Sequence, residues 1–351
     1  MLVPSRLGCR GGSWPDATMH LQTTFQTGMR EWVLAAYQDD RGEIHHRYVL
    51  YWVTPKAAHT KITKLLRSPP FTTLNTSAGH DGVDSTWSPE KVQAVQRWAA
   101  PRGLGRDVRR IAEAQLEAAL RLEPLEFTFI REPLSHLVSA AAQAHFCLST
   151  TDCTVREQAA SRSSAPLHLD SAADVVRLLN YSLKEALPPQ VIEGDARAMR
   201  IYSRFYKRWR PCTSRERAGA RLFLHACLQH MRPQSAGGLP FHAGGREPRG
   251  GGPRAGVHFI GQMEALGQEW RRLLQALGAS TDAAARHAVA AGKLVNTQRA
   301  RRVAPALMPG GEALAELERN PLVRRHLAAD KQCFASTLVA GKSTRAHANS
   351  V

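Results

Sequence analysis

Two segments about seventy residues apart limit what this chain can fold into, because each changes from a strand to a helix at a proline. One is Tyr48–Lys61, YVLYWVTPKAAHTK, and the other is Phe127–Ala140, FTFIREPLSHLVSA. Each begins with the β-branched and aromatic residues typical of a strand. Repeated strand-to-helix units predict an α/β fold with a central parallel sheet flanked by helices.

A cation stands at the end of each of these strands. Lys56 follows the first strand, and Arg131 ends the second. Open α/β sheets bind ligands at the carboxyl ends of their strands. Two cationic corners at such positions predict one ligand that carries anionic groups at both ends.

Residues next to each cation are also suited to binding an anion. Ala57 and Ala58 are small enough for the backbone to approach an anion at the positive end of the following helix. Ser139 lies eight residues after Arg131, two helical turns along, so both side chains are candidates for one phosphate. Taken singly, the first corner is equally compatible with a core strand followed by an ordinary helix. At the second corner taken singly, the favoured interpretation is an ion pair of Arg131 with Glu132 or a neighbouring acid, with Ser139 as a small packing residue. The glycines of a Walker A loop are missing, which disfavours an ordinary nucleotide triphosphatase.

The remaining pattern predicts strands joined by helices in the first half of the chain and helices in the second. Strands are expected at 32–37, 46–53 and 126–130, with a turn at 39–42 and a polar loop at 71–86. Helices are expected at 57–66, 107–122, 134–146, 174–187, 214–230, 260–277, 282–295 and 311–328, and Ser88-Pro89-Glu90 resembles a helix start. This order of strands and helices predicts a single domain over residues 29–336. An irregular lead-in is expected at 1–28 and a disordered tail at 337–351. Gly, Arg and Pro crowd 237–256, which predicts a flexible insertion.

The net charge of +17 raises the question of nucleic-acid binding. Of the 47 cations 38 are arginines, and they are spread along the whole chain rather than gathered in one patch. No helix-turn-helix, zinc or RNA-binding signature accompanies them. A nucleic-acid partner is therefore not expected, and a phosphorylated or polyanionic ligand, or simple codon bias, explains the charge as well.

The sequence constrains the cellular compartment of the protein less than its fold. No run approaches the ~20 apolar residues of a membrane helix, and no signal peptide or anchor is visible near the first residue. The six cysteines lack zinc-ligand spacing, so no metal is expected. Cys147 and Cys153 are either free thiols or a small disulfide loop. Two glycosylation sequons, at Asn75 and Asn180, fit a luminal glycoprotein but also arise by chance.

Together the two segments resemble the sulfotransferases that use 3′-phosphoadenosine 5′-phosphosulfate (PAPS), in particular the Golgi carbohydrate branch that includes chondroitin 4-O-sulfotransferases and algal relatives. The first segment is similar to the family's strand followed by Pro-Lys-x-x-x-Thr, and the second to its strand followed by Arg-Asp/Glu-Pro. Three further stretches resemble family motifs in the expected order: 230–234 (HMRPQ), 258–266 (HFIGQMEAL) and 330–334 (DKQCF). The resemblance covers roughly residues 46–335.

The resemblance implies a P-loop-like sulfotransferase fold with a helical C-terminal half, PAPS as co-substrate and a carbohydrate hydroxyl as acceptor. The family's 5′-phosphosulfate loop corresponds to Pro55, Lys56, Ala57, Ala58, His59, Thr60 and Lys61, and its 3′-phosphate motif to Arg131 and Ser139. Sulfuryl transfer is an in-line displacement that needs positive charge on the bridging oxygen, a role for Lys56, and a base for the acceptor hydroxyl. The basic chain suggests an anionic glycan, and the family is usually found in the Golgi lumen or membrane.

The general base is open between His80 and His230. The chain also departs from the family pattern at four places: His59 in the first loop, His136 after the second strand, Ala335-Ser336 in place of a closing Gly-Tyr, and the insertion at 237–256 between two motifs. One alternative to the enzyme is therefore an inactive relative that binds the same nucleotide. The basic charge leaves a second alternative, a nucleic-acid-binding protein. The oligomeric state is not indicated by the sequence.

Overall fold

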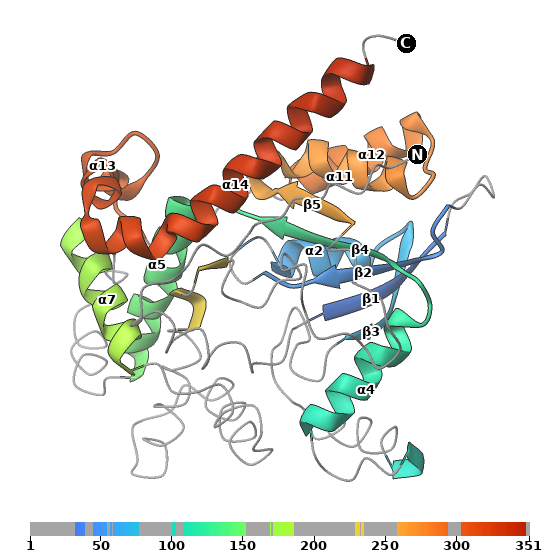
Figure 1. Cartoon of the computed structure of the whole chain (residues 1–351), viewed down its shortest axis with the longest axis horizontal. Coiled ribbons are helices and arrows are strands. Elements are labelled where there is room, and N and C mark those ends of the chain that lie inside the picture. The colour runs from blue at the N-terminus through green and yellow to red at the C-terminus, as the bar shows by residue number, and fades with distance from the viewer. Residues whose placement is uncertain are drawn as a thin grey trace, which may run out of the picture.

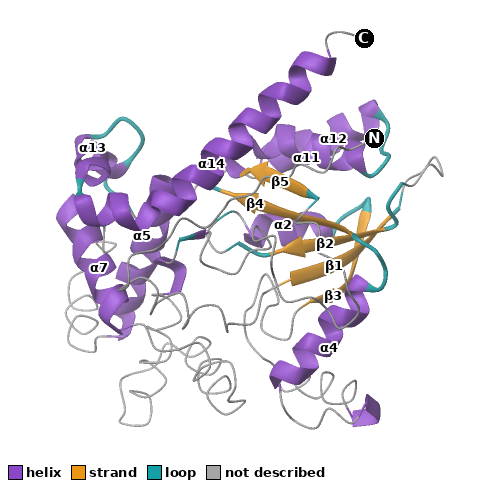
Figure 2. Ribbon diagram, in the orientation of Figure 1, coloured by secondary structure: helices purple, strands orange, loops and turns teal. Residues whose placement is uncertain are grey.

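The computed structural model describes residues 32–38, 45–54, 57, 59–76, 100–102, 108–151, 169, 171–185, 229–231, 233–234, 258–293 and 303–348. Within these ranges, five strands form one sheet with helices on both faces, and a group of helices lies beside the sheet (Figures 1 and 2). The lead-in at 1–28, the helix start at 88–90, the insertion at 237–256 and nearly all of the expected helix at 214–230 fall outside these residues.

The sheet is mixed, in contrast to the wholly parallel sheet that was expected. Its strands are β1 (Trp32–Tyr37), β2 (Tyr48–Trp52), β3 (Phe71–Thr76), β4 (Leu125–Ile130) and β5 (Phe259–Gln262), in the order β3-β1-β2-β4-β5. β2, β4 and β5 are parallel, whereas β1 runs antiparallel to both β2 and β3. The parallel prediction is thus correct for one side of the sheet. The other side is antiparallel because the link from β1 to β2 is too short for a crossover.

Two segments were assigned wrongly from the sequence. Residues 71–76 were expected in a polar loop but form edge strand β3, where Phe71 is buried against Tyr37 with ring centroids 5.5 Å apart. The expected helix at 260–277 instead begins with β5, and helix α11 (Leu266–Ala276) starts only after a short 3-10 turn. A four-residue apolar run does not reveal by its periodicity whether it is strand or helix.

The other expected helices that fall in the described ranges are present, with shifted ends. They are α2 (His59–Leu66), α4 (Val108–Leu120), α5 (Pro133–Thr151), α7 (Ala172–Glu185) and α12 (Thr281–Lys293). The single helix expected at 311–328 is two helices, α13 (Glu312–Arg319) and α14 (Pro321–Ala348). Asn320 divides them, and its side-chain oxygen accepts hydrogen bonds from the amides of Leu322 and Val323. α14 is helical through 348, where a disordered tail was expected from 337.

Side chains alternate between the two faces of the sheet, as strand geometry requires. One face, which carries Val49, Tyr51 and Phe127, packs against α2, α11 and α12. The opposite face, which carries Leu50 and Trp52, packs against α4 and against Phe334 of α14. The sheet is therefore the middle layer of an α/β/α arrangement.

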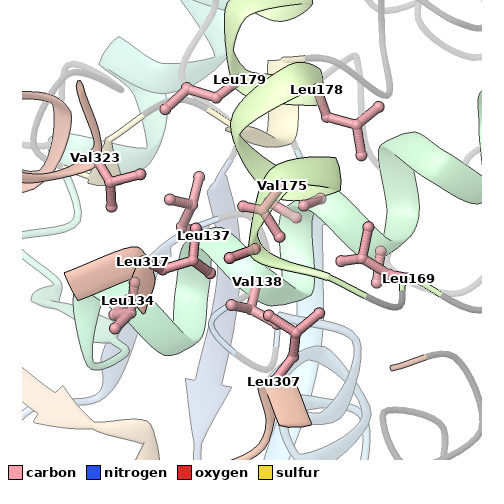
Figure 3. Close-up of a cluster of buried hydrophobic side chains, with 14 of the residues drawn as sticks. Leu134, Leu137, Val138, Leu169, Val175, Leu178, Leu179, Leu307, Leu317 and Val323 are labelled. Atoms are coloured by element: carbon pink, nitrogen blue, oxygen red, sulfur yellow. The ribbon is translucent and has the colours of Figure 1, made fainter. Parts of the chain in front are cut away.

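A second core lies beside the sheet and is built from helices. Its buried side chains come from α5, α7, α13 and α14, and Figure 3 shows Leu137, Val175 and Leu317 among them. Met231 of the 3-10 turn η2 (Gln229–Met231) belongs to the same core. Helix α5 thus starts at the edge of the sheet and continues into the helical group. No helix of the described residues is long and apolar enough to cross a membrane.

Candidate functional site

The two corners lie side by side at the carboxyl edge of the sheet. β2 and β4 are neighbouring parallel strands, with Trp52 opposite Thr128. The buried Thr128 hydroxyl donates to the Trp52 carbonyl oxygen at 2.8 Å and lies 3.0 Å from the Thr54 hydroxyl. Because the Thr128 proton is committed to the carbonyl, the Thr54 hydroxyl is the donor between the two threonines. This buried link holds the start of the first corner against β4.

The first corner begins with a turn in which the amide of Ala57 donates to the carbonyl oxygen of Thr54 at 3.2 Å. Ala57 is completely buried. At the start of α2, His59 is half-buried and Thr60 is exposed, and His59 Nε2 lies 3.2 Å from the Thr60 hydroxyl. Pro55, Lys56 and Ala58 lie outside the described residues, so the predicted loop is placed only in part.

The second corner is occupied by Arg131, which is only 4% exposed. Its Nε donates to the Ser135 hydroxyl at 3.1 Å, one turn into α5. The sequence indicated Ser139, which is half-buried one turn further along the helix. Ser135 was missed, although its spacing of four residues from Arg131 was visible in the sequence.

The Glu132 carboxylate caps the start of α5. Its two oxygens accept hydrogen bonds from the amides of Leu134 at 3.0 Å and Ser135 at 2.6 Å, and Pro133 occupies the next position. This carboxylate occupies amides that a helix start otherwise offers to an anion. At the second corner an anionic ligand therefore depends on side-chain donors such as Arg131.

Lys61 of α2 connects the two corners electrostatically. The pKa of Lys61 is lowered, first by its partial burial and second by the positive charge of Arg131. Lys61 comes from the helix after β2 and Arg131 from the end of β4, so each corner contributes one cation to a shared region. Like charges brought together away from water raise the free energy of the site, and an anion placed near both lowers it.

Gln234 fixes the backbone of Arg131. The Arg131 amide donates to Gln234 Oε1 at 2.8 Å, and Gln234 Nε2 donates to the Arg131 carbonyl oxygen at 2.7 Å. The Gln234 amide in turn donates to Asp330 Oδ2 at 2.7 Å, and both Gln234 and Asp330 are buried. In addition, the Glu132 amide donates to Glu264 Oε1 at 3.0 Å. Gln234, Glu264 and Asp330 each belong to one of the three later stretches that were singled out in the sequence, and all three stretches meet at the second corner.

Of the two histidines proposed as general base, only His230 lies in the described part of the structure. His80 lies outside the described residues, whereas His230 is half-buried in η2, next to Met231. A buried histidine of α14, His326, contacts the Met231 carbonyl oxygen with its Nε2 at 2.8 Å. Burial lowers the pKa of His326 to about 4, against an opposing effect of this hydrogen bond. His326 is therefore neutral at physiological pH and donates to the carbonyl oxygen, which fixes the turn that carries His230.

No group of His, Cys, Asp or Glu side chains suited to a metal ion occurs within the described ranges. A hollow of about 610 Å³ lies between α7 and α13, with Arg177, Asn180 and Glu316 in its wall, and it contains no residue of either corner. Comparison of the chain with models of protein families, with curated proteins and with solved structures gave no match.

Proposed function

We propose that this protein is a PAPS-dependent sulfotransferase that transfers a sulfuryl group to a hydroxyl of a carbohydrate. The observation that carries the proposal is that the two corners lie at the carboxyl ends of the neighbouring parallel strands β2 and β4, with Arg131 buried at the end of β4. The pKa of Lys61, lowered by its partial burial and then by the charge of Arg131, is in keeping with this arrangement. A ligand with separate anionic groups satisfies both cations. PAPS is such a ligand, because it carries a phosphosulfate at the 5′ position and a phosphate at the 3′ position.

In this proposal the first corner holds the 5′-phosphosulfate and the second holds the 3′-phosphate. Lys56, Lys61 and the amides of 57–61 form the first binding group, and Arg131 with Ser135 or Ser139 forms the second. The buried link between Thr54 and Thr128 keeps the distance between the corners constant. Such preorganisation lowers the cost of binding a ligand at two points.

The reaction is a displacement at sulfur. The acceptor hydroxyl oxygen forms a bond to sulfur as the bond from sulfur to the bridging phosphate oxygen breaks, and 3′-phosphoadenosine 5′-phosphate leaves with the electron pair of that bond. Lys56 stabilises the negative charge that develops on the bridging oxygen. His230 or His80 takes the proton of the acceptor hydroxyl. The fold assigned to this chemistry is the P-loop-like sulfotransferase fold, and no metal is needed in any step.

The convergence of the later sequence stretches on the second corner supports the same family. Gln234, Glu264 and Asp330 come from three stretches that were singled out because each resembles a family motif in the expected order. Each of the three residues lies within one or two hydrogen bonds of the segment Arg131–Glu132. If these stretches resembled the family motifs only by chance, they would not be expected to lie together in the structure. The acceptor is proposed to be an anionic glycan, consistent with the net charge of +17, and the compartment to be the Golgi.

A thermal-shift titration with 3′-phosphoadenosine 5′-phosphate beside ATP tests the cofactor class. The proposal expects the melting temperature to rise with the first nucleotide and to stay constant with ATP. Transfer from labelled PAPS to a panel of glycans then separates an active enzyme from an inactive relative. A chain that ignores the bisphosphate nucleotide but binds DNA duplex with a steep salt dependence contradicts the proposal and indicates the nucleic-acid alternative.

A further inference from the structure

The side chain of Gln234 forms the backbone hydrogen bonds that a neighbouring strand would form with Arg131 if the ladder continued. The β4–β5 ladder ends at the pair Ile130 and Gln262, one residue before Arg131. Beyond this point the amide and the carbonyl of Arg131 are both bound by the side-chain amide of Gln234, at 2.8 and 2.7 Å. The backbone of Arg131 is therefore held as in a sheet, but by a side chain from a segment about one hundred residues later in the sequence.

Helix α14 fixes that segment at two points. Asp330 accepts a hydrogen bond from the Gln234 amide, and His326, one turn earlier on the same helix, donates to the Met231 carbonyl oxygen. His326, Asp330 and Gln234 are all buried. The position of Arg131 and the position of the turn that carries His230 thus depend on the same helix.

We infer that Gln234 is a positioning residue, which sets the direction in which Arg131 meets the anion of its ligand. The inference rests on the proposed function, because it assigns the 3′-phosphate to Arg131. A buried arginine binds a phosphate well only when its guanidinium is correctly oriented. Gln234 provides that orientation because it fixes the backbone from which the arginine side chain extends, while Ser135 holds Nε.

The side-chain amide of glutamine suits this task, because it combines a donor and an acceptor that match the two backbone groups of one residue. Methionine is similar in length and volume but forms neither hydrogen bond. Gln234→Met therefore removes the two hydrogen bonds with little change in packing. Gln115 of α4, which packs on the sheet, is a matched control: it is similarly buried, at 5% against 7%, and its side-chain oxygen has no hydrogen-bond partner.

The test compares two ligands on three proteins by calorimetry. The ligands are 3′-phosphoadenosine 5′-phosphate and adenosine 5′-phosphosulfate, which lacks the 3′-phosphate. The proteins are the unmodified chain, Gln234→Met and Gln115→Met. Gln234→Met is expected to weaken binding of the first ligand by about 10- to 100-fold and to leave binding of the second unchanged. Gln115→Met is expected to bind both like the unmodified chain. A general loss of packing would weaken both ligands together.

A double-mutant cycle shows whether Gln234 acts through Arg131. In an Arg131→Met background, the further change Gln234→Met is expected to have no effect on affinity for the 3′-phosphorylated nucleotide. Equal affinities of the unmodified chain and Gln234→Met would contradict the inference alone. An unmodified chain that binds neither nucleotide would contradict the proposed function, and the inference with it. If Gln234→Met does not fold, Gln234→Glu, which keeps the acceptor for the Arg131 amide, takes its place with the same expectations.

Discussion

Arg131 is the residue on which the site depends, and its surroundings explain why a charged side chain is stable at only 4% exposure. The Ser135 hydroxyl accepts a hydrogen bond from Nε of Arg131. The side chain of Gln234 binds both the amide and the carbonyl of the Arg131 backbone. Burial of an arginine is costly unless its donors are satisfied. In the proposed function, part of that cost serves binding, because a charge held in a preorganised, poorly hydrated position attracts an anion more strongly than one in water.

Lys61 is expected to take part in binding, and Lys64 on the same helix is not. Lys61→Met should weaken the affinity for 3′-phosphoadenosine 5′-phosphate by about 10-fold or more, because a charge-assisted interaction is lost. Lys64 is exposed one turn further along α2, so Lys64→Met controls for the change in net charge. Calorimetry at a fixed salt concentration gives both affinities. Equal losses in the two variants would show that only the overall charge matters.

His326 makes stability depend on pH. Its pKa is lowered from 6.5 to about 4 by burial, so between these values the unfolded chain binds a proton that the folded chain does not. Stability is therefore fully present above pH 6.5 and falls as the pH drops towards 4, by a total on the order of 3 kcal/mol. Urea denaturation at several pH values measures this slope.

The variant His326→Gln separates this effect from other acid-sensitive groups. Glutamine can still donate to the Met231 carbonyl oxygen but does not titrate. The free energy of unfolding of His326→Gln should therefore fall less steeply between pH 6.5 and 4 than that of the unmodified chain. Identical slopes in the two proteins would mean that another group causes the acid sensitivity.

At the scale of elements, the sequence predicted those whose residues show a repeated pattern. The strands at 32–37, 48–52 and 125–130, and the helices that follow the second and third of them, agree with β-branched runs and apolar spacing in the sequence. β3 was missed because the sequence of Thr72, Thr73 and Asn75 resembles a polar loop. β3 is an edge strand, and Thr72 on it is exposed to water. β5 was missed because four residues are too few to show a period.

Strand β5 needs glycine at position 261. A methyl group there would lie 2.5 Å from the ring of Phe129, its partner across the β4–β5 ladder. Gly261→Ala should therefore lower the free energy of unfolding by about 1–3 kcal/mol. The combination with Phe129→Leu should recover part of that loss, because the smaller side chain makes room. A double variant whose losses simply add would refute this steric explanation.

Glu132 is expected to stabilise the start of α5. Glu132→Ala removes the acceptor for the amides of Leu134 and Ser135 and should lower the free energy of unfolding by about 0.5–2 kcal/mol. Glu132→Asp keeps a carboxylate near these amides and should retain most of the stability. Chemical denaturation of the three proteins gives the comparison. Equal denaturation midpoints in the unmodified chain, Glu132→Ala and Glu132→Asp would show that the Glu132 carboxylate does not stabilise the helix.

At the scale of the whole molecule, the described residues form one cluster of buried side chains on each face of the sheet and another among the helices beside it. Helix α5 leaves the sheet at Pro133 and enters the helical core, and α14 contributes Val323 to the helical core and packs Phe334 against one face of the sheet. Figure 1 shows α14 passing across the top of this region. The site thus lies where residues from β4, α5, η2 and α14 come together.

The sequence alone indicated Arg131 as part of the site, and the later stretches only as resemblances to family motifs in the expected order. It did not indicate that Gln234 binds the backbone of Arg131, because that contact joins residues about one hundred positions apart by tertiary packing. The four-residue spacing of Ser135 from Arg131 was visible in the sequence and was overlooked. Ser139, His80 and the loop at 55–58 stay predictions. The sequence placed a turn at 39–42 between the first two strands, but the antiparallel pairing of β1 was not predicted, since the sheet was expected to be parallel.

The central claim is that one nucleotide with two anionic ends occupies both corners, and calorimetry with 3′-phosphoadenosine 5′-phosphate tests it most directly. The titration is carried out on the unmodified chain, on Lys56→Ala in the first corner and on Arg131→Ala in the second. The account predicts binding by the unmodified chain and its loss in each variant, because each variant removes the cation for one end of the ligand. Unchanged affinity in both variants would contradict it.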